Sequence, residues 1–189
     1  MKRYNYYLPF AVSADVNYIF ILKLYRLKAE YNYKTKLFEK IQFKNLKELS
    51  ERLNISYDTL NRERKNEENK LFFALDTKGK TIELNSNFKN SNKPFIKLTD
   101  REVSFLLERN DNLLCKYLIY LKYYCSKAEG TFTQEQFLSA IGYCSKSGKN
   151  KNKLSEYNKI LVENGFLFVL TRFSEQESKR RNRYKYISE

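Results

Sequence analysis

The stretch Thr133–Phe168, TQEQFLSAIGYCSKSGKNKNKLSEYNKILVENGFLF, decides the fold of this chain. Thr133 followed three residues later by Gln136 is the signature of a capping box at a helix start. A turn rich in Ser, Lys and Asn then leads to a second helix, which we expect from about residue 150 to residue 164. Gly165 is typical of a helix end, and the apolar run 166–173 is typical of a strand. The stretch therefore predicts helix, turn, helix and strand in succession.

Its neighbours extend this order on both sides. An apolar helix is expected upstream at 113–124, and a final strand downstream at 184–187. Helix, short helix, turn, helix and β-hairpin is the order of a winged helix, which is a variant of the helix-turn-helix. The alternative is an ordinary α+β domain whose second helix pair packs only as core.

The first half of the chain repeats the order. An apolar helix at 16–30 is followed by two short helices, which Asn45 and Ser56 are placed to cap, and by a β-hairpin within 71–84. The second of these helices is expected at 57–68, with Tyr57 and Leu60 facing inward. The sequence therefore predicts an α+β, mainly helical chain with two winged-helix domains in tandem.

A polar stretch separates the two halves. The segment 85–94, NSNFKNSNKP, concentrates Asn and Ser, contains a Pro, and has only Phe88 to bury. We therefore expect an N-terminal domain over 1–84, a linker at 85–94 and a C-terminal domain over 95–189. A capping box at Thr99–Glu102 marks the first helix of the second half.

The quoted stretch resembles the helix-turn-helix of Gram-positive phage and plasmid replication proteins. The shared features are Ile141-Gly142-Tyr143, the Ser/Lys/Asn-rich turn, and Leu161-Val162-Glu163-Asn164-Gly165 before a hydrophobic strand. The tandem layout resembles replication initiators with two winged-helix domains, which bind repeated origin DNA. The resemblance implies a DNA-binding protein of replication initiation, with a second copy of the chain and host replication proteins as further partners.

Composition favours a polyanionic partner over catalysis. The chain has 189 residues, 36 Lys and Arg against 22 Asp and Glu, and a formal net charge of +14. It contains no His, which removes His-based acid–base catalysis and His-containing metal sites. It also lacks a phosphate-binding GxxxxGK[ST] loop. We therefore expect double-stranded DNA as the partner, and no enzyme activity, metal or cofactor.

The candidate DNA-binding residues of the second half surround its second helix and its hairpin. Lysines at a helix N-terminus oppose the helix dipole, so a purely stabilising role is a poor explanation for them. Amides such as those of Asn150 and Asn152 match the major-groove edge of adenine. The alternatives are a solvated charge run and a surface loop. The candidates are Lys146, Lys149, Asn150, Lys151, Asn152, Lys153, Ser155, Lys159, Arg172, Lys179, Arg180, Arg181 and Arg183.

A weaker set lies in the first half. Acidic residues, including Glu63, dilute the outward face of its second short helix, and dimerisation is the alternative role for this domain. The candidates here are Thr59, Asn61, Arg62, Lys65, Lys78 and Lys80.

Cysteines and apolar segments bear on the compartment. The three cysteines lack CxxC spacing and fit a reducing cytoplasm as free thiols. Asp15 and Asn17 interrupt the N-terminal apolar stretch, so neither export nor a membrane span is expected. The helix at 113–124 carries four tyrosines and is apolar on nearly every side, which is typical of a core helix or a dimer interface.

Three functions compete at this stage. The leading hypothesis is a sequence-specific double-stranded DNA-binding protein that initiates or organises plasmid or phage replication. A winged-helix transcription regulator is the alternative. A strand-cleaving enzyme with a tyrosine nucleophile has less support, because no His or metal partner accompanies the tyrosines.

Overall fold

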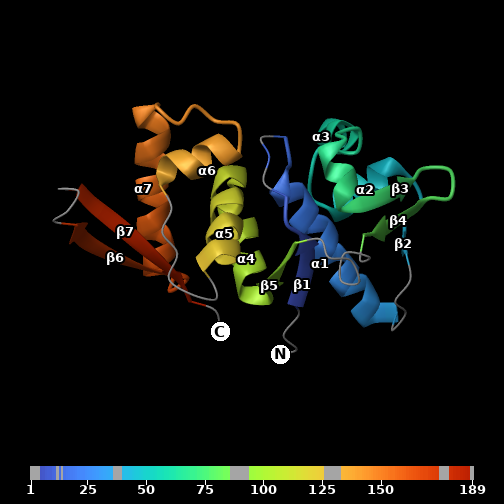
Figure 1. The fold of residues 1–189 in the computed structure, drawn as a ribbon. Helices are drawn as coiled ribbons and strands as arrows, with labels where there is room; N and C mark the ends of the chain where they lie inside the picture. The colour runs from blue at the N-terminus through green and yellow to red at the C-terminus, as the bar shows by residue number, and fades with distance from the viewer. Residues whose placement is uncertain are drawn as a thin grey trace. The chain divides into compact units, whose positions relative to one another are not determined.

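The computed structural model describes residues 5–11, 13, 15–35, 40–85, 94–125, 133–174 and 179–187. Within these residues the chain is α+β, with seven α-helices, one 3-10 helix and small antiparallel sheets (Figure 1). Helices make up roughly half of the described residues and strands a smaller part, which confirms the predicted α+β class.

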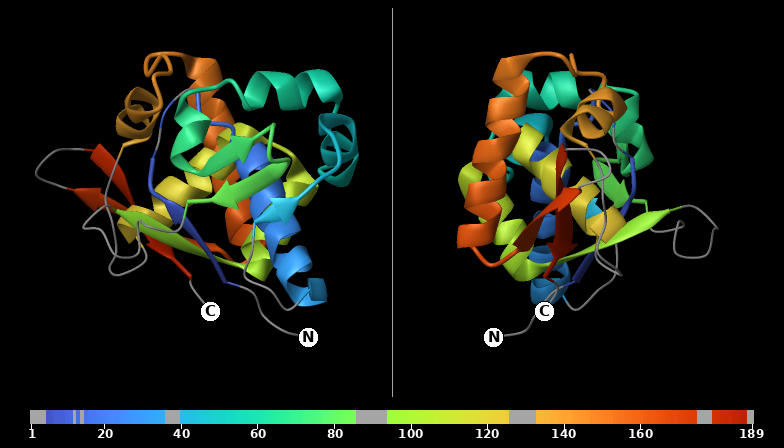
Figure 2. Two further views of the ribbon diagram at one scale, coloured as in Figure 1. Left: turned by 90° about the vertical axis from the view of Figure 1, so that its right-hand side faces the viewer. Right: turned by 60° about the vertical axis from the view of Figure 1, so that its left-hand side comes forward.

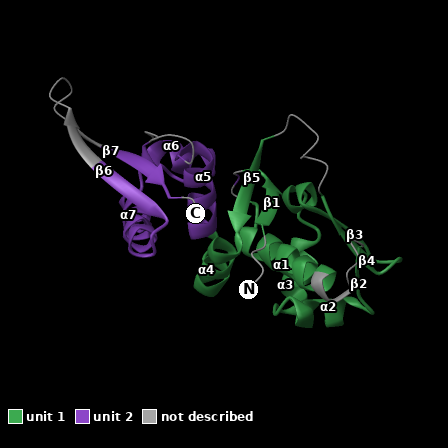
Figure 3. Cartoon of the chain, turned by 90° about the horizontal axis from the view of Figure 1, so that it is seen from below, with its two compact units in different colours: residues 1–11, 15–112 green, residues 12–14, 113–189 purple. Residues whose placement is uncertain are grey.

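The chain divides into two compact units (Figure 3). Unit 1 holds residues 1–11 and 15–112, and unit 2 holds residues 12–14 and 113–189. The elements of unit 1 are β1 (Asn5–Pro9), α1 (Tyr18–Thr35), β2 (Ile41–Gln42), α2 (Leu46–Arg52), α3 (Tyr57–Glu63), the 3-10 helix η1 (Glu68–Leu71), β3 (Phe73–Asp76), β4 (Thr81–Leu84), β5 (Phe95–Thr99) and α4 (Asp100–Arg109). Those of unit 2 are α5 (Asn112–Cys125), whose first residue is counted in unit 1, α6 (Gln134–Ala140), α7 (Gly148–Glu163), β6 (Leu167–Ser174) and β7 (Lys179–Tyr186).

This division differs from the boundary expected at 85–94, of which residues 86–93 lie outside the described part of the chain. Strand β5 pairs antiparallel with β1, from Asn5 opposite Thr99 to Pro9 opposite Phe95. The backbone N–H of Phe10 extends the pairing by donating to the carbonyl of Pro94. Tyr6, Leu8, Ile96 and Leu98 are buried on one face of the pair. The residues after the expected linker therefore belong to the same unit as the N-terminus, and neither strand had been predicted.

Short helices and a three-stranded sheet make up the middle of unit 1. Strand order is β2-β4-β3, so the β3–β4 hairpin also receives the short strand that precedes α2 (Figure 2). Asn45 and Ser56 cap α2 and α3 as predicted, each accepting a hydrogen bond from a backbone N–H three residues on. Helix α3 ends at Glu63, earlier than the predicted Glu68, because the Asn66 side chain accepts from the N–H of Glu68 and starts a separate turn.

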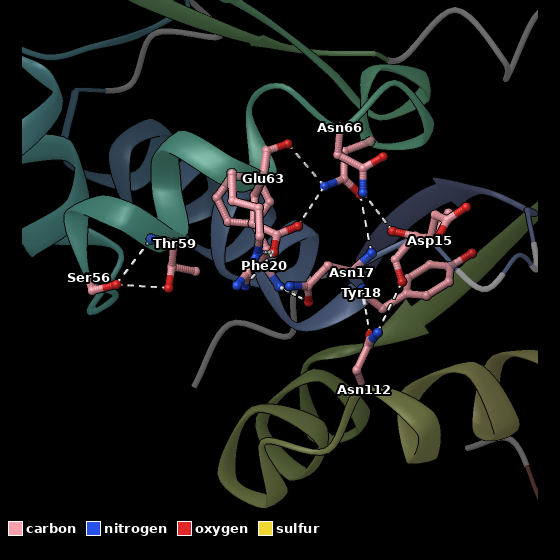
Figure 4. A network of polar contacts seen from close by, with 12 residues as sticks. Asp15, Asn17, Tyr18, Phe20, Ser56, Thr59, Glu63, Asn66 and Asn112 are labelled. Carbon is pink, nitrogen blue, oxygen red and sulfur yellow. Dashed lines mark hydrogen bonds and ion pairs between the residues drawn. The ribbon is translucent and has the colours of Figure 1, made fainter.

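Asparagine side chains hold the start of α1 (Figure 4). The N–H of Asn17 donates to the side-chain oxygen of Asn69 (3.2 Å), and the N–H of Tyr18 donates to that of Asn112 (2.8 Å). The amide group of Asn69, fully buried, donates in turn to the carbonyl of Glu63 (3.1 Å) and to its carboxylate (3.0 Å). Side chains from two distant parts of unit 1 thus satisfy backbone groups that a helix start leaves unpaired.

In unit 2 the predicted capping box and the predicted glycine at a helix end are confirmed. Thr133 and Gln136 form a capping box at α6. Gly142 and Gly165 follow α6 and α7 with φ of 73° and 71°, the left-handed region that glycine adopts most readily at helix ends. Strands β6 and β7 then pair antiparallel over eight residues each (Figure 2).

The buried Asn69 network yields a stability prediction. Replacing Asn69 with Ala leaves the Asn17 N–H and the Glu63 carboxylate without their buried partner, so the free energy of unfolding should fall by about 1–3 kcal/mol. Urea denaturation followed by circular dichroism measures the change. Asn152→Ala is the control, because Asn152 is an exposed helix residue and its loss should change stability by less than about 0.5 kcal/mol. Equal effects of the two substitutions would contradict the structural role of Asn69.

Candidate nucleic-acid interface

The turn between α6 and α7 positions the N-terminus of α7. The N–H of Tyr143 donates to the carbonyl of Leu138 (2.8 Å), which closes the turn after α6. Ser147 caps α7 by accepting from the N–H of Asn150 (3.4 Å). The Asn150 side chain donates to the carbonyl of Cys144 (3.1 Å), so this amide binds the turn itself.

The inner side of α7 is apolar and packs in the core of unit 2. Leu154, Tyr157 and Leu161 are all buried. The ring of Tyr157 lies 6.3 Å from that of Tyr117 in α5, which itself lies 5.0 Å from Phe137 in α6. Three helices therefore share one aromatic core. Helix α7 cannot turn its polar side inward without exposing the apolar residues that it buries in this core.

A side-chain hydrogen bond also holds α7 in place, at the edge between its apolar and polar sides. The hydroxyl of Tyr117 donates to the side-chain oxygen of Asn158 in α7 (2.8 Å). A hydrogen bond also joins Tyr117 to Tyr184 in β7. Burial raises the pKa of Tyr117 well above its ordinary value, so this hydroxyl keeps its proton and stays a donor.

Two of the predicted DNA-binding residues connect α6 to α7. The ammonium of Lys151 lies 2.6 Å from the carboxylate of Glu135 in α6. The hydroxyl of Ser155 donates to the carbonyl of Lys151 (3.1 Å) and accepts from the side-chain amide of Gln134 (3.2 Å). These contacts hold the two helices together, so Lys151 and Ser155 already have partners within unit 2.

The remaining candidates on and before α7 are exposed. They are Lys146, Lys149, Asn152, Lys153 and Lys159. Four of these five precede the middle of the helix, whereas Glu156 and Glu163, also exposed, lie further along it. The N-terminal half of α7 is thus the basic half. Free N–H groups and the positive end of the dipole lie at the same end, which suits phosphate.

The hairpin places the other basic candidates along paired strands. Register sets Arg172 opposite Arg181, Ser174 opposite Lys179 and Leu170 opposite Arg183. Arg180 stands opposite Phe173. Arg183 and Lys185 are exposed, and Lys185 is a basic residue of this hairpin that the sequence analysis did not select. The alternation of basic residues at 179, 181, 183 and 185 is the signal that would have found it.

In unit 1 most polar side chains of α3 have partners within the unit. Arg62 donates twice to the carboxylate of Glu63, through Nε (3.0 Å) and a terminal nitrogen (2.9 Å). Asn61 accepts from the guanidinium of Arg64 (2.9 Å), and Thr59 accepts from the hydroxyl of Ser56 (2.8 Å). The exposed basic candidates of this unit are Arg62, which pairs with Glu63, and Lys65, Lys78 and Lys80.

Two residues of α3 lie on faces other than those predicted. Tyr57, expected to face inward, is 48% exposed. Glu63, expected on the outward face, is buried, with its carboxylate bonded to Arg62 and Asn69. Helical spacing alone predicted these orientations wrongly, because a partner outside the helix decides the side of Glu63.

Comparisons with protein-family models, curated proteins and solved structures find no match for this chain. Among the described residues, no group of three or more His, Cys, Asp or Glu side chains is placed to hold a metal ion. Within the same residues, no helix has the length and apolar character needed to cross a membrane.

The Glu135–Lys151 pair gives a prediction about the pKa of Glu135 and the pH dependence of stability. The hydrogen bond and charge of Lys151 hold the pKa of the Glu135 carboxyl below its ordinary value. A depressed folded-state pKa contributes stability at neutral pH, and this contribution is lost as the pH falls below the ordinary glutamate value of about 4.3. A carbon NMR titration of the Glu135 carboxyl should show a raised pKa in Lys151→Ala. Lys149→Ala should leave it unchanged, and an unchanged value in Lys151→Ala would show that the pair is absent in solution.

Proposed function

We propose that this chain is a sequence-specific double-stranded DNA-binding protein in which unit 2 reads the DNA through α7. The observation that carries the proposal is the division of α7 into a fully buried apolar side and an exposed basic N-terminal half. Since a recognition helix enters the major groove with its N-terminal residues against base edges, this polarity is the one that the role requires.

The order of elements supports a winged-helix interpretation of both units. Unit 1 has α1, β2, α2, α3 and the β3–β4 hairpin in sequence, and unit 2 has α5, α6, α7 and the β6–β7 hairpin. Each is a set of helices followed by a β-hairpin, the order expected for a helix-turn-helix with a wing. We propose α3 and α7 as the two recognition helices, and no catalytic step.

The two units are proposed to differ in role. Thr59 and Asn61 in α3 bond to neighbouring side chains and the exposed Arg62 pairs with Glu63, whereas Lys149 and Asn152 in α7 are exposed. Unit 2 is therefore the better candidate for reading bases, and unit 1 for positioning the protein on DNA or for dimerisation. Initiation of plasmid or phage replication is the biological role that the sequence resemblance favours.

Selection of bound DNA from a random pool tests the function directly. An enriched motif is expected, and direct repeats spaced by about one helical turn, 10–10.5 base pairs, would favour an initiator. A short palindrome would favour a transcription regulator instead. A pool without enrichment, together with weak binding to every duplex, would reject both roles.

Substitutions in α7 separate base reading from phosphate binding. Asn152→Ala should weaken binding to the selected site by about 1–3 kcal/mol and have little effect on random DNA, because an amide reads a base edge. Lys149→Ala should weaken binding to both and reduce the slope of log K against log salt by about 1, because a phosphate contact releases one counterion. Fluorescence anisotropy at several salt concentrations measures both effects.

Glu163→Gln is the matched control for these two variants. Glu163 is an exposed residue of the same helix, at the acidic end. Its replacement should leave both the affinity for random DNA and the salt slope nearly unchanged. If instead Lys65→Ala in unit 1 abolishes binding while Lys149→Ala and Asn152→Ala do not, unit 1 is the reader and the assignment is reversed.

A further inference from the structure

The two faces of the β6–β7 hairpin differ in character. Leu167, Tyr184 and Tyr186 are buried and mark the face that packs on the core of unit 2. Arg183 and Lys185 are exposed, and Phe168, directly opposite Lys185, is 50% exposed. Because side chains alternate along a strand and paired residues share a face, these positions define a second face turned away from the core.

The register assigns most of the hairpin's basic residues to that second face, which we call the outer face. Positions 179, 181, 183 and 185 of β7 alternate along it, and they stand opposite positions 174, 172, 170 and 168 of β6. Five of the six basic residues in the two strands occupy outer-face positions, and neither strand contains an acidic residue. The outer-face positions with basic residues are Arg172, Lys179, Arg181, Arg183 and Lys185; Arg180 is the exception.

The register pairs position 172 directly with position 181, so basic residues stand at neighbouring positions of the two strands. The basic residues extend from Lys179 to Lys185, a length of about 20 Å at the rise of a strand. A polyanion lying along the strand can reach positions at this spacing together.

We propose that the outer face of the β6–β7 hairpin binds the sugar–phosphate backbone of a nucleic acid along its whole length, from Lys179 to Lys185. The proposal rests on the DNA-binding function given above and extends it in two ways. It adds Lys185, at the end of the hairpin nearest the core, and it removes Arg180, whose position belongs to the other face. Phe168 beside Lys185 adds an apolar contact for a sugar or a base.

The test compares neighbouring residues of equal charge on opposite faces, in the full-length chain. Lys185→Ala and Arg181→Ala should each weaken binding to a duplex of random sequence by about eightfold at 0.1 M salt, with a salt slope shallower by about 0.9. Arg180→Ala should change the affinity and the salt slope by much less. Arg181→Lys should restore binding, since it keeps the charge. Thermal denaturation of each variant, with a melting temperature expected to match that of the wild-type chain, separates lost binding from lost folding.

Each other outcome counts against the outer face. Equal losses in Arg180→Ala and Arg181→Ala would mean that the end of the hairpin binds, whichever face the residues occupy. If Lys185→Ala binds DNA with wild-type affinity, the contact with DNA does not extend along the hairpin as far as Lys185. Binding of phosphatidylserine vesicles that is lost in Arg181→Ala and Lys185→Ala, with unchanged DNA binding, would assign the face to an anionic membrane surface. A wild-type chain that binds no duplex would reject the proposed function itself.

Discussion

The side chain of Tyr117 joins the elements on which the candidate interface of unit 2 depends. Its ring lies against Phe137 of α6 and Tyr157 of α7, and its hydroxyl donates to Asn158 of α7. A hydrogen bond to Tyr184 adds β7 to the same set. One buried aromatic residue with a polar end thus ties two helices and a strand to α5, because a buried hydroxyl must find partners.

That constraint explains how unit 2 can carry an unfavourable surface. Lysines near the N-terminus of α7 oppose the helix dipole. This arrangement costs folding free energy. Burial of Leu154, Tyr157 and Leu161 in the shared core offsets this cost, since each large apolar side chain buried contributes about 1.5–3 kcal/mol.

Unit 1 uses its polar residues differently. The side chains of Asn69 and Asn112 accept from the N–H groups of Asn17 and Tyr18 at the start of α1, and the carboxylate of Glu63 accepts from both Asn69 and Arg62. The side chains of α3 are thereby largely committed to its own unit. A surface whose polar groups already have partners gains less from a new ligand, because each new hydrogen bond must replace an existing one.

The sequence by itself determined the local elements of this protein. Caps at Asn45, Ser56 and Thr133 and the inward side of α7 follow from neighbouring residues, since capping bonds and helical periodicity act within a few positions. Only the tertiary structure decided what depends on distant partners. The pairing of β1 with β5 places the residues after the expected linker in the same unit as the N-terminus. The contact with Asn69 holds Glu63 in a buried position. The ion pair of Glu135 with Lys151 also joins residues that are distant in the sequence. No local pattern specifies which residues sixteen or about ninety positions apart will meet.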